Sequence, residues 1–303
     1  MNLISQIDEI KSKITGKIHY DESLSKYSWF NLGGPAKVIF KPNTLHELSI
    51  FLQKVGRLSK ITVLGAGSNT LIRDGGYDGI IIKLGKSFSR ISLFDENTII
   101  AGSSCLDRNV SNYAKENSLS GFEFLSCIPG TIGGGVRMNS GCYGEDISNI
   151  LISLQVMDLD GKMKIISKDD IKFSYRETNI DKDFIFISAT FKGKKNNILN
   201  IQKKVDKLVK KKKEDQPSKI KTCGSTFKNP KNNKAWKLID SSGCAELNIG
   251  DASISKQHSN FFINNGKAKS EDLERLINLV KDKVFKKTGM KLELELKIIG
   301  ESL

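Results

Sequence analysis

The glycine-rich segment at residues 127–144 constrains the fold of this chain most, because its eighteen residues include six glycines. Apolar residues lie between the glycines, where a flexible linker would have serine and glutamine. A backbone without Cβ atoms can approach a flat cofactor or a pyrophosphate group closely, and it can also form a tightly packed turn. The segment therefore predicts an ordered loop that either binds a ligand or packs the interior.

A second glycine turn follows an apolar run at residues 61–64 and begins like a dinucleotide-binding fingerprint, with Gly65 and Gly67. The fingerprint then fails, because a Rossmann loop would have its third glycine where this chain has Thr70. Consecutive N–H groups in a glycine turn can still form an anion-binding nest without a helix. We expect the turn either to bind a phosphate group or to be an ordinary turn.

Composition places the chain among globular proteins of two or three domains, with 303 residues, 38% hydrophobic and 27% charged. No apolar run approaches the ~20 residues needed to span a bilayer. Asp8 and Glu9 lie where a secretory signal would need a basic start and an apolar stretch. We therefore expect an amphipathic N-terminal helix and a cytoplasmic protein without a membrane partner.

The five cysteines form no Cys-x-x-Cys pair, and only three histidines accompany them. Neither a disulfide framework nor a metal site is indicated. Cys223 lies two residues before Ser225, but no histidine base is near it in sequence. We expect Cys223 to be a small buried or loop thiol and not a nucleophile.

The formal net charge of +14 suggests binding to a phosphate backbone, but much of the excess lies at residues 203–213. An apolar stripe runs through that stretch and comprises Ile201, Val205, Leu208 and Val209. We interpret the stretch as a helix with a solvated basic face. It lacks interleaved aromatic residues for base stacking, which argues against nucleic acid, whereas a basic surface can attract anionic substrates.

Hydrophobic alternation and turn signals predict an α+β chain without internal repeats. Strands are expected at residues 36–40, 61–64, 79–84, 97–100, 154–158, 164–167, 184–191, 251–255, 261–263 and 291–299. Those at 154–158 and 164–167 flank the turn Asp160-Gly161, which predicts a hairpin. Helices are expected at residues 44–55, 107–117, 235–241 and 270–287. Thr44 and Ser270 are the expected N-caps, and Glu47 is expected to complete a capping box with Thr44.

Three further segments carry polar groups that suit catalysis. Ser225 follows a glycine, among basic and amide side chains able to hold an anion. Arg176 lies far from it in sequence, and Glu293 and Glu295 alternate with leucine near the C-terminus. Period-two alternation puts both acids on the same strand face, so periodicity cannot choose between them. Taken alone, these residues are also consistent with a turn, a surface arginine and solvent-facing acids.

Together with the glycine segments, these residues resemble the UDP-N-acetylenolpyruvoylglucosamine reductase family, the flavoenzymes that complete UDP-N-acetylmuramate for bacterial cell-wall synthesis. The resemblance extends over residues 27–301. It implies a two-part FAD-binding domain of the vanillyl-alcohol-oxidase/PCMH type followed by a smaller α+β substrate-binding domain. It also implies noncovalent FAD, NADPH as hydride donor, UDP-N-acetylglucosamine-enolpyruvate as substrate, and a protein that we expect to be a monomer.

The resemblance and the turn-rich stretch at residues 214–230 lead us to expect three parts. These are an N-terminal helix at residues 1–20, the FAD-binding domain at 21–199, with subdomains of about 21–90 and 91–199, and the substrate-binding domain at 200–303. A final strand at residues 291–300 is expected to bring Glu295 to the active site.

The same resemblance implies catalytic roles for Arg176, Ser225 and Glu295. Arg176 would stabilise negative charge on the substrate carboxylate, and Ser225 would donate the proton that quenches the carbanion or enol. His258 is expected to be structural or to support a site residue. Residues implied to contact FAD are Asn31, Gly33, Gly34, Gly65, Ala66, Gly67, Ser68, Asn69, Pro129, Gly130, Thr131, Gly133, Gly134 and Asn139. Residues implied to hold the UDP moiety are Lys213, Lys228 and Asn229.

The chain departs from the family pattern at two places. Gly135 and Arg137 stand where the family more often has small or apolar residues. Only six residues separate Arg176 from Asp183, so the tyrosine-bearing loop of the family's longer form is absent. The chain therefore resembles the shorter form, and its diphosphate contacts must differ.

Two other functions remain open from the sequence. An FAD-dependent oxidase of the same cofactor fold would act on an alcohol or a sugar, and oxygen-driven turnover without NADPH would favour it. A protein whose basic helix binds nucleic acid would be colourless and would bind DNA in a salt-sensitive way.

Overall fold

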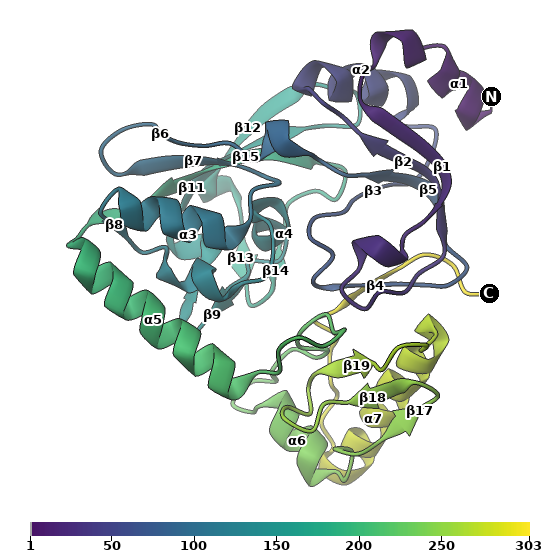
Figure 1. The fold of residues 1–303 in the computed structure, drawn as a ribbon, viewed down its shortest axis with the longest axis vertical. Coiled ribbons are helices and arrows are strands. Elements are labelled where there is room, and N and C mark those ends of the chain that lie inside the picture. The colour runs from purple at the N-terminus through teal and green to yellow at the C-terminus, as the bar shows by residue number, and fades with distance from the viewer. Residues whose placement is uncertain (1) are drawn as a thin grey trace. The chain divides into compact units, whose positions relative to one another are not determined.

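The computed structural model describes residues 2–303, which divide into two compact units (Figure 1). Unit 1 comprises the chain up to Tyr20, Val38–Ala66 and Gly79–Lys211. Unit 2 comprises Asp21–Lys37, Gly67–Asp78 and Lys212–Leu303. Each unit is built from three stretches of chain, so neither is contiguous in sequence.

The first sheet of unit 1 has the strand order β1-β2-β5-β3, and the ends of three strands continue into unit 2. Its elements are α1 (Leu3–Asp8), β1 (Lys17–Ser23), β2 (Pro35–Lys41), α2 (Leu45–Val55), β3 (Ile61–Val63) and β5 (Tyr77–Ile82). Phe40 of β2 stacks on Phe51 of α2 with ring centroids 4.0 Å apart, which packs the helix on the sheet.

The expected helix at residues 44–55 is confirmed as α2, and the Thr44 side chain accepts the Glu47 N–H as an N-cap. The expected capping box is wrong in its second half. The Glu47 carboxylate accepts the N–H groups of Asn43 and Thr15 in place of the Thr44 N–H.

A five-stranded antiparallel sheet, with order β12-β11-β15-β7-β6, forms the second part of unit 1. Its strands are β6 (Ile91–Leu93), β7 (Thr98–Gly102), β11 (Leu151–Met157), β12 (Met163–Ser167) and β15 (Ile185–Lys192). Helices α3 (Asp107–Glu116) and α4 (Ile132–Arg137) cover one face, with apolar side chains of both helices in the same core as those of the sheet (Figure 1). The expected strands, hairpin and helix in this region are confirmed.

Short strand pairs and a long helix complete unit 1. The pairs are β8 (Leu119–Ser120) with β16 (Lys194–Lys195), β9 (Gly141–Cys142) with β10 (Glu145–Asp146), and β13 (Phe173–Ser174) with β14 (Glu177–Thr178). Helix α5 (Ile198–Asp215) is the expected basic helix and continues into unit 2. Ile201 is buried, Val205 and Leu208 are half-buried and most of the lysines are exposed, which confirms a solvated basic face.

Unit 2 combines a three-stranded antiparallel sheet, two helices and a parallel strand pair. Its elements are β4 (Thr70–Ile72), α6 (Ala235–Ser241), β17 (Asn248–Ile249), β18 (Ala252–Ile254), β19 (Phe262–Asn264), α7 (Ser270–Thr288) and β20 (Lys297–Ile299). Phe30, Leu32 and Leu71 pack in one core with residues of α6, α7 and β18. This core therefore joins segments from both ends of the sequence.

Two expectations for unit 2 are wrong in detail. The N-cap of α7 is Lys269 and not Ser270, whose hydroxyl donates to Asp74 at 2.9 Å. The final strand is β20, which is shorter than the expected 291–299. Ahead of it, Leu294 forms an isolated antiparallel bridge with Phe227.

Candidate active site

The residues expected to form the site are divided between the two units. Unit 1 contains Gly65, Ala66, Pro129, Gly130, Thr131, Gly133, Gly134, Asn139 and Arg176. Unit 2 contains Asn31, Gly33, Gly34, Gly67, Ser68, Asn69, Lys213, Ser225, Lys228, Asn229 and Glu295. Within each unit, hydrogen bonds and close packing fix the positions of these residues.

In unit 1, backbone hydrogen bonds hold the glycine segment against residues 103–107. The Gly133 N–H donates to the Ser103 carbonyl at 2.8 Å, and the Asp107 N–H donates to the Gly130 carbonyl at 3.2 Å. Thr131 lies between these contacts in a bridge with Leu106, and α4 begins at the next residue. The segment is therefore an ordered loop, as its composition predicted.

The two glycine segments of unit 1 lie against each other. A Cβ atom on Gly65 would lie 2.6 Å from Thr131 Oγ1. Lys83 Nζ donates to the Gly65 carbonyl, and burial lowers the pKa of Lys83 to about 8, with Lys41 acting in the same direction. Sequence reasoning missed Lys83, because a lysine after an apolar strand carries no motif.

The space beside Gly134 shows whether a nucleotide can lie against this loop. It is exposed, and a Cβ atom there would meet only Thr131 Oγ1, at 3.6 Å. The packing of the protein thus leaves room beside Gly134, so a ligand can lie directly on the backbone. Together with the amine of Lys83, this arrangement fits the phosphate groups of a nucleotide cofactor.

Asp107 lies beneath the same loop and is fully buried. A Cβ atom on Gly130 would lie 2.7 Å from Asp107 Oδ2, and neither carboxyl oxygen has a hydrogen-bond partner among residues 2–303. Burial raises the pKa of Asp107 to about 8, so the group is mostly neutral at pH 7. A neutral acid does not repel an anionic cofactor. Sequence reasoning missed Asp107, because an aspartate in the first turn of a helix is common.

Arg176 lies in the two-residue turn between β13 and β14, where Ser174 pairs with Glu177. Its φ of 61° is in the left-handed region. The Arg176 Nη2 group donates to the Gly141 carbonyl at 2.7 Å, and the guanidinium lies 4.9 Å from the Tyr175 ring centroid. These contacts give the cationic group a fixed direction.

Asn139 connects the glycine segment to this hairpin. Its side-chain Nδ2 donates to the Ser174 carbonyl at 3.1 Å and to Asp146 at 3.2 Å, while its Oδ1 accepts the Ser148 N–H at 3.1 Å. The side chain is 3% exposed. Its contacts orient the hairpin that carries Arg176, and direct contact with FAD stays a prediction.

In unit 2, the fold itself requires the glycine at position 67. Its φ is +70°, and a Cβ atom there would lie 1.8 Å from the Tyr27 carbonyl oxygen. Likewise, a Cβ atom on Gly33 would lie within 3 Å of Ile72, and a Cβ atom on Gly34 would lie within 3 Å of Asp74. Close packing accounts for these three glycines, and their contact with FAD stays a prediction.

Ser225 lies in an extended segment that is held by hydrogen bonds with Asn260. The Thr226 N–H donates to the Asn260 carbonyl at 2.8 Å. The Asn260 side chain, 3% exposed, binds both the N–H and the carbonyl of Phe227, at 3.0 and 2.9 Å. Gly224 supplies the preceding turn with a φ of +77°. Sequence reasoning missed Asn260, since a single asparagine gives no periodic or spacing signal.

Glu295 lies beside this segment. Its N–H donates to the Thr226 carbonyl at 2.9 Å, and its own carbonyl accepts Asn69 Nδ2 at 3.0 Å. Three stretches far apart in sequence therefore lie side by side within unit 2. Residues 291–296 are not in a regular strand, so the expectation that Glu293 and Glu295 share one face stays a prediction. The Glu293 side chain is 77% exposed, whereas Glu295 is half-buried.

The residues expected to hold the UDP moiety have distinct surroundings. Lys228 Nζ lies 3.8 Å from Glu293 and is largely buried. Asn229 Oδ1 accepts the N–H of Ala235, the first residue of α6, at 2.9 Å. Lys213 is exposed in the last turn of α5. Their contact with substrate stays a prediction.

Cys223 and His258 have the structural character that the sequence suggested. Cys223 Sγ lies 3.4 Å from the Thr70 carbonyl, and burial raises the pKa of the thiol to about 11, which removes it as a nucleophile at neutral pH. The His258 ring packs 4.8 Å from Phe261, and burial lowers the pKa of His258 below its ordinary value.

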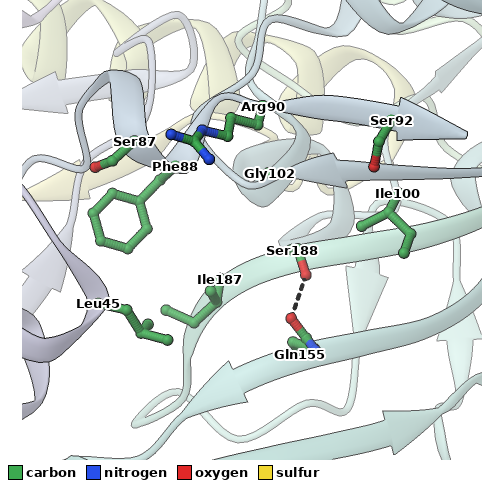
Figure 2. A pocket seen from close by; sticks show the side chains of 10 residues that line it. All are labelled: Leu45, Ser87, Phe88, Arg90, Ser92, Ile100, Gly102, Gln155, Ile187 and Ser188. Carbon is green, nitrogen blue, oxygen red and sulfur yellow. Dashed lines mark hydrogen bonds between the residues drawn. The ribbon is translucent and has the colours of Figure 1, made fainter. Parts of the chain in front are cut away.

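A separate pocket of about 290 Å³ opens on the face of the five-stranded sheet opposite α3 and α4 (Figure 2). The Ser188 hydroxyl donates to Gln155 Oε1 at 2.8 Å on its floor, and Arg90 and Phe88 lie at its rim. None of the expected site residues lines it.

Residues 2–303 contain neither a cluster of side chains suited to a metal ion nor a membrane-spanning helix. No cluster of three or more His, Cys, Asp or Glu side chains in this range could hold a metal ion. No helix in the same range has the length and apolar character needed to cross a bilayer.

Family models first identify the class of protein. Residues 36–167 match the FAD binding domain, and residues 216–299 match the C-terminal domain of UDP-N-acetylenolpyruvoylglucosamine reductase. The first match contains both glycine segments of unit 1, and the second contains Ser225, Asn260 and Glu295. The chain is therefore an FAD-binding oxidoreductase, and the expected order of domains is confirmed.

Individual relatives agree over nearly the full length. The chain is 48% identical over 299 residues to UDP-N-acetylenolpyruvoylglucosamine reductase of Pelagibacter ubique, covering 98% of this chain and 99% of the relative. It is 44% identical over 288 residues to that of Rickettsia bellii, covering 95% of each. The crystal structure of the reductase from Thermus caldophilus matches with a TM-score of 0.82 and 28% identity, over 95% of this chain and 100% of that one. This chain belongs to the UDP-N-acetylenolpyruvoylglucosamine reductase family.

Proposed function

We propose that this chain reduces the enolpyruvyl group of UDP-N-acetylglucosamine-enolpyruvate, with NADPH as hydride donor, to give UDP-N-acetylmuramate in the cytoplasm. One observation carries the proposal. Glu295 pairs through its backbone with the segment of Ser225, and Asn69 of a glycine turn donates to Glu295. The segments that carry the proposed proton donor, the proposed catalytic glutamate and the proposed cofactor turn thus lie side by side in unit 2.

FAD, held by the glycine segments, would supply the chemistry that carries hydride from NADPH to the carbon–carbon double bond. Negative charge then develops toward the substrate carboxylate, where Arg176 acts as a donor already oriented by the Gly141 carbonyl. Ser225 donates the proton that completes the reduction. A serine hydroxyl is a weak acid, so its proton transfer requires a strongly basic carbon centre and a polarising environment. We propose that Glu295 belongs to that environment.

The UDP moiety carries two phosphate groups and so requires cationic donors. We propose Lys213 and Lys228 for this role, together with the amide of Asn229. Asn229 Oδ1 accepts the N–H of Ala235, which holds this side chain at the start of α6. A chain of the shorter form without the tyrosine loop depends on such side chains for its diphosphate contacts.

Ser225→Ala tests the central assignment. Reduction of the flavin by NADPH requires no proton from Ser225, so its rate should stay close to that of the wild type. Reoxidation by the enolpyruvyl substrate should slow by at least ~10²–10⁴-fold, the usual contribution of a general acid. Stopped-flow absorbance of the flavin measures each half-reaction separately.

Ser218→Ala, at an exposed position of unit 2, is the control and should leave both rates unchanged. Equal slowing of both half-reactions in Ser225→Ala would mean that Ser225 shapes the site without donating the proton. Normal reoxidation would assign the proton donor to another residue. Oxygen-driven turnover of an alcohol or sugar without NADPH would favour the oxidase alternative.

A further inference from the structure

Arg137 forms three side-chain hydrogen bonds close to the Arg176 hairpin. It is the last residue of α4, and its guanidinium lies 4.2 Å from the Phe186 ring centroid. The guanidinium donates to three backbone carbonyls, at 3.0, 2.8 and 2.6 Å, which belong to Ile180, Asp181 and Phe184.

Those carbonyls lie in the connection between β14 and β15, directly after Arg176. This connection, residues 179–184, overlaps the six-residue stretch 177–182 that is too short to hold the tyrosine loop of the family's longer form. Short irregular connections leave carbonyl groups without sheet partners, and a planar guanidinium can bind several of them at fixed angles. Arg137 stands where the family more often has a small or apolar residue, and it binds the short connection. The two differences from the family pattern are therefore in contact.

The same turn of α4 also holds the two strands of the hairpin. The Thr178 hydroxyl of β14 donates to the Arg137 carbonyl at 3.1 Å. On the other strand, Asn139 donates to the Ser174 carbonyl at 3.1 Å. The hairpin is therefore fixed on β13, on β14 and in the connection that follows, and Arg176 lies at its tip.

The guanidinium of Arg137 remains charged at physiological pH. Burial lowers its pKa to about 10, while Asp181 acts in the opposite direction. Its hydrogen bonds to the three carbonyls are therefore charge-assisted, which makes them shorter and stronger than bonds from a neutral donor.

We propose that Arg137 is a positioning residue for Arg176: it fixes the short connection after the hairpin and so holds the Arg176 guanidinium in its reactive direction. This inference rests on the role of Arg176 in the proposed function. It predicts that loss of Arg137 impairs the half-reaction in which Arg176 acts and leaves the other intact.

The experiment compares Arg137→Met, which keeps most of the side-chain volume, with Arg137→Lys and with Arg108→Met. Arg108 is exposed on α3 and serves as the matched control. Each holoenzyme is examined by stopped-flow absorbance in both half-reactions. We expect normal flavin content and normal reduction by NADPH in Arg137→Met, with reoxidation slowed roughly 10- to 100-fold, because a misplacement of about 1 Å has effects of that size. Arg137→Lys should recover part of the rate.

A double-mutant cycle with Arg176→Lys separates this inference from the proposed function. If Arg137 acts through Arg176, Arg137→Met should slow reoxidation much less in the Arg176→Lys background. Full additivity would overturn the positioning role while the role of Arg176 stands. Loss of FAD, or equal slowing of both half-reactions, in Arg137→Met and Arg137→Lys would also overturn it. Normal reoxidation in Arg176→Lys itself would overturn the proposed role of Arg176 and the inference with it.

Discussion

Single residues near the proposed site are held largely by backbone groups. Arg176 donates to a carbonyl, Glu295 is bound through its N–H, and Asn260 binds both backbone groups of Phe227. Backbone acceptors and donors remain available whatever side chain lies nearby, so this arrangement fixes direction without using a second reactive group. Buried bonds of this kind cost about 1–3 kcal/mol each when one partner is removed.

Asp107 gives a pH-dependent prediction at the same scale. Its pKa is raised to about 8 by burial in the folded state and is about 3.9 in an unfolded chain. The folded state therefore holds a proton that the unfolded state releases, so this group destabilises the protein increasingly as pH rises from about 4 to 8. The cost at pH 7 is on the order of 4 kcal/mol, well above the roughly 0.3–1 kcal/mol by which a helix N-terminus favours an anion.

Asp107→Asn removes the titration and keeps the shape. The free energy of unfolding of the variant, relative to wild type, should rise between pH 5 and pH 8 and then level off. Urea unfolding of both proteins across this range measures the difference. A difference that does not change with pH in this range would show that Asp107 is ionised in the folded protein and that its pKa is not raised.

A single residue could be predicted from the sequence only where its role is associated with a motif or a characteristic spacing. Ser225 lies in a recognisable loop, and Cys223 was correctly interpreted as a buried thiol because no base accompanies it. Asn260, Lys83 and Asp107 act through burial and through contacts with distant backbone. Such contacts leave no spacing signal, so no reading of one sequence could have found them.

At the scale of elements, Gly134 of α4 offers a test of the cofactor loop. Alanine at this exposed helical position would meet only Thr131 Oγ1, at an ordinary contact distance of 3.6 Å, so stability should stay the same or rise by up to about 1 kcal/mol. The added methyl group would occupy the room in which we expect FAD to lie. Gly134→Ala should therefore weaken FAD binding, measured by titrating the apoprotein with flavin, without lowering the free energy of unfolding.

Gly85→Ala is the matched control, since Gly85 also has open space around it and an ordinary φ of −99°. It should change neither FAD affinity nor stability. Unchanged affinity in Gly134→Ala would move the cofactor contact away from this turn of α4.

Elements were predictable where local signals agreed with tertiary packing. The helix at α2 has a side-chain cap and an apolar face, and the hairpin of β11 and β12 has a turn between two apolar runs, so both were found from sequence. The final strand was overestimated, because alternation of Glu and Leu continues through residues 291–296 although the backbone there forms only isolated contacts with the Ser225 segment. The cap of α7 was misplaced because Ser270 bonds to Asp74, a residue remote in sequence.

At the scale of the whole molecule, the discontinuity of unit 2 could not be seen in sequence. Its core combines Phe30, Leu32 and Leu71 with side chains from residues 223–296. Arg73 binds Glu274 of α7 through two hydrogen bonds of 2.8 Å, and β4 pairs with β20. Turn signals mark positions along one chain, whereas these contacts join segments about two hundred residues apart.

This arrangement predicts the behaviour of an isolated C-terminal fragment. The expected boundary at residue 200 stays a prediction, and a fragment of residues 200–303 tests it directly. The fragment lacks three core side chains, each of which stabilises by roughly 1.5–3 kcal/mol when buried, and it leaves β20 without its partner β4. Since a domain is stable by only about 5–15 kcal/mol, the fragment should not unfold cooperatively in urea, whereas the full chain should. A fragment that unfolds in one sharp transition, with an m-value appropriate to its size, would establish that residues 200–303 form an independent domain.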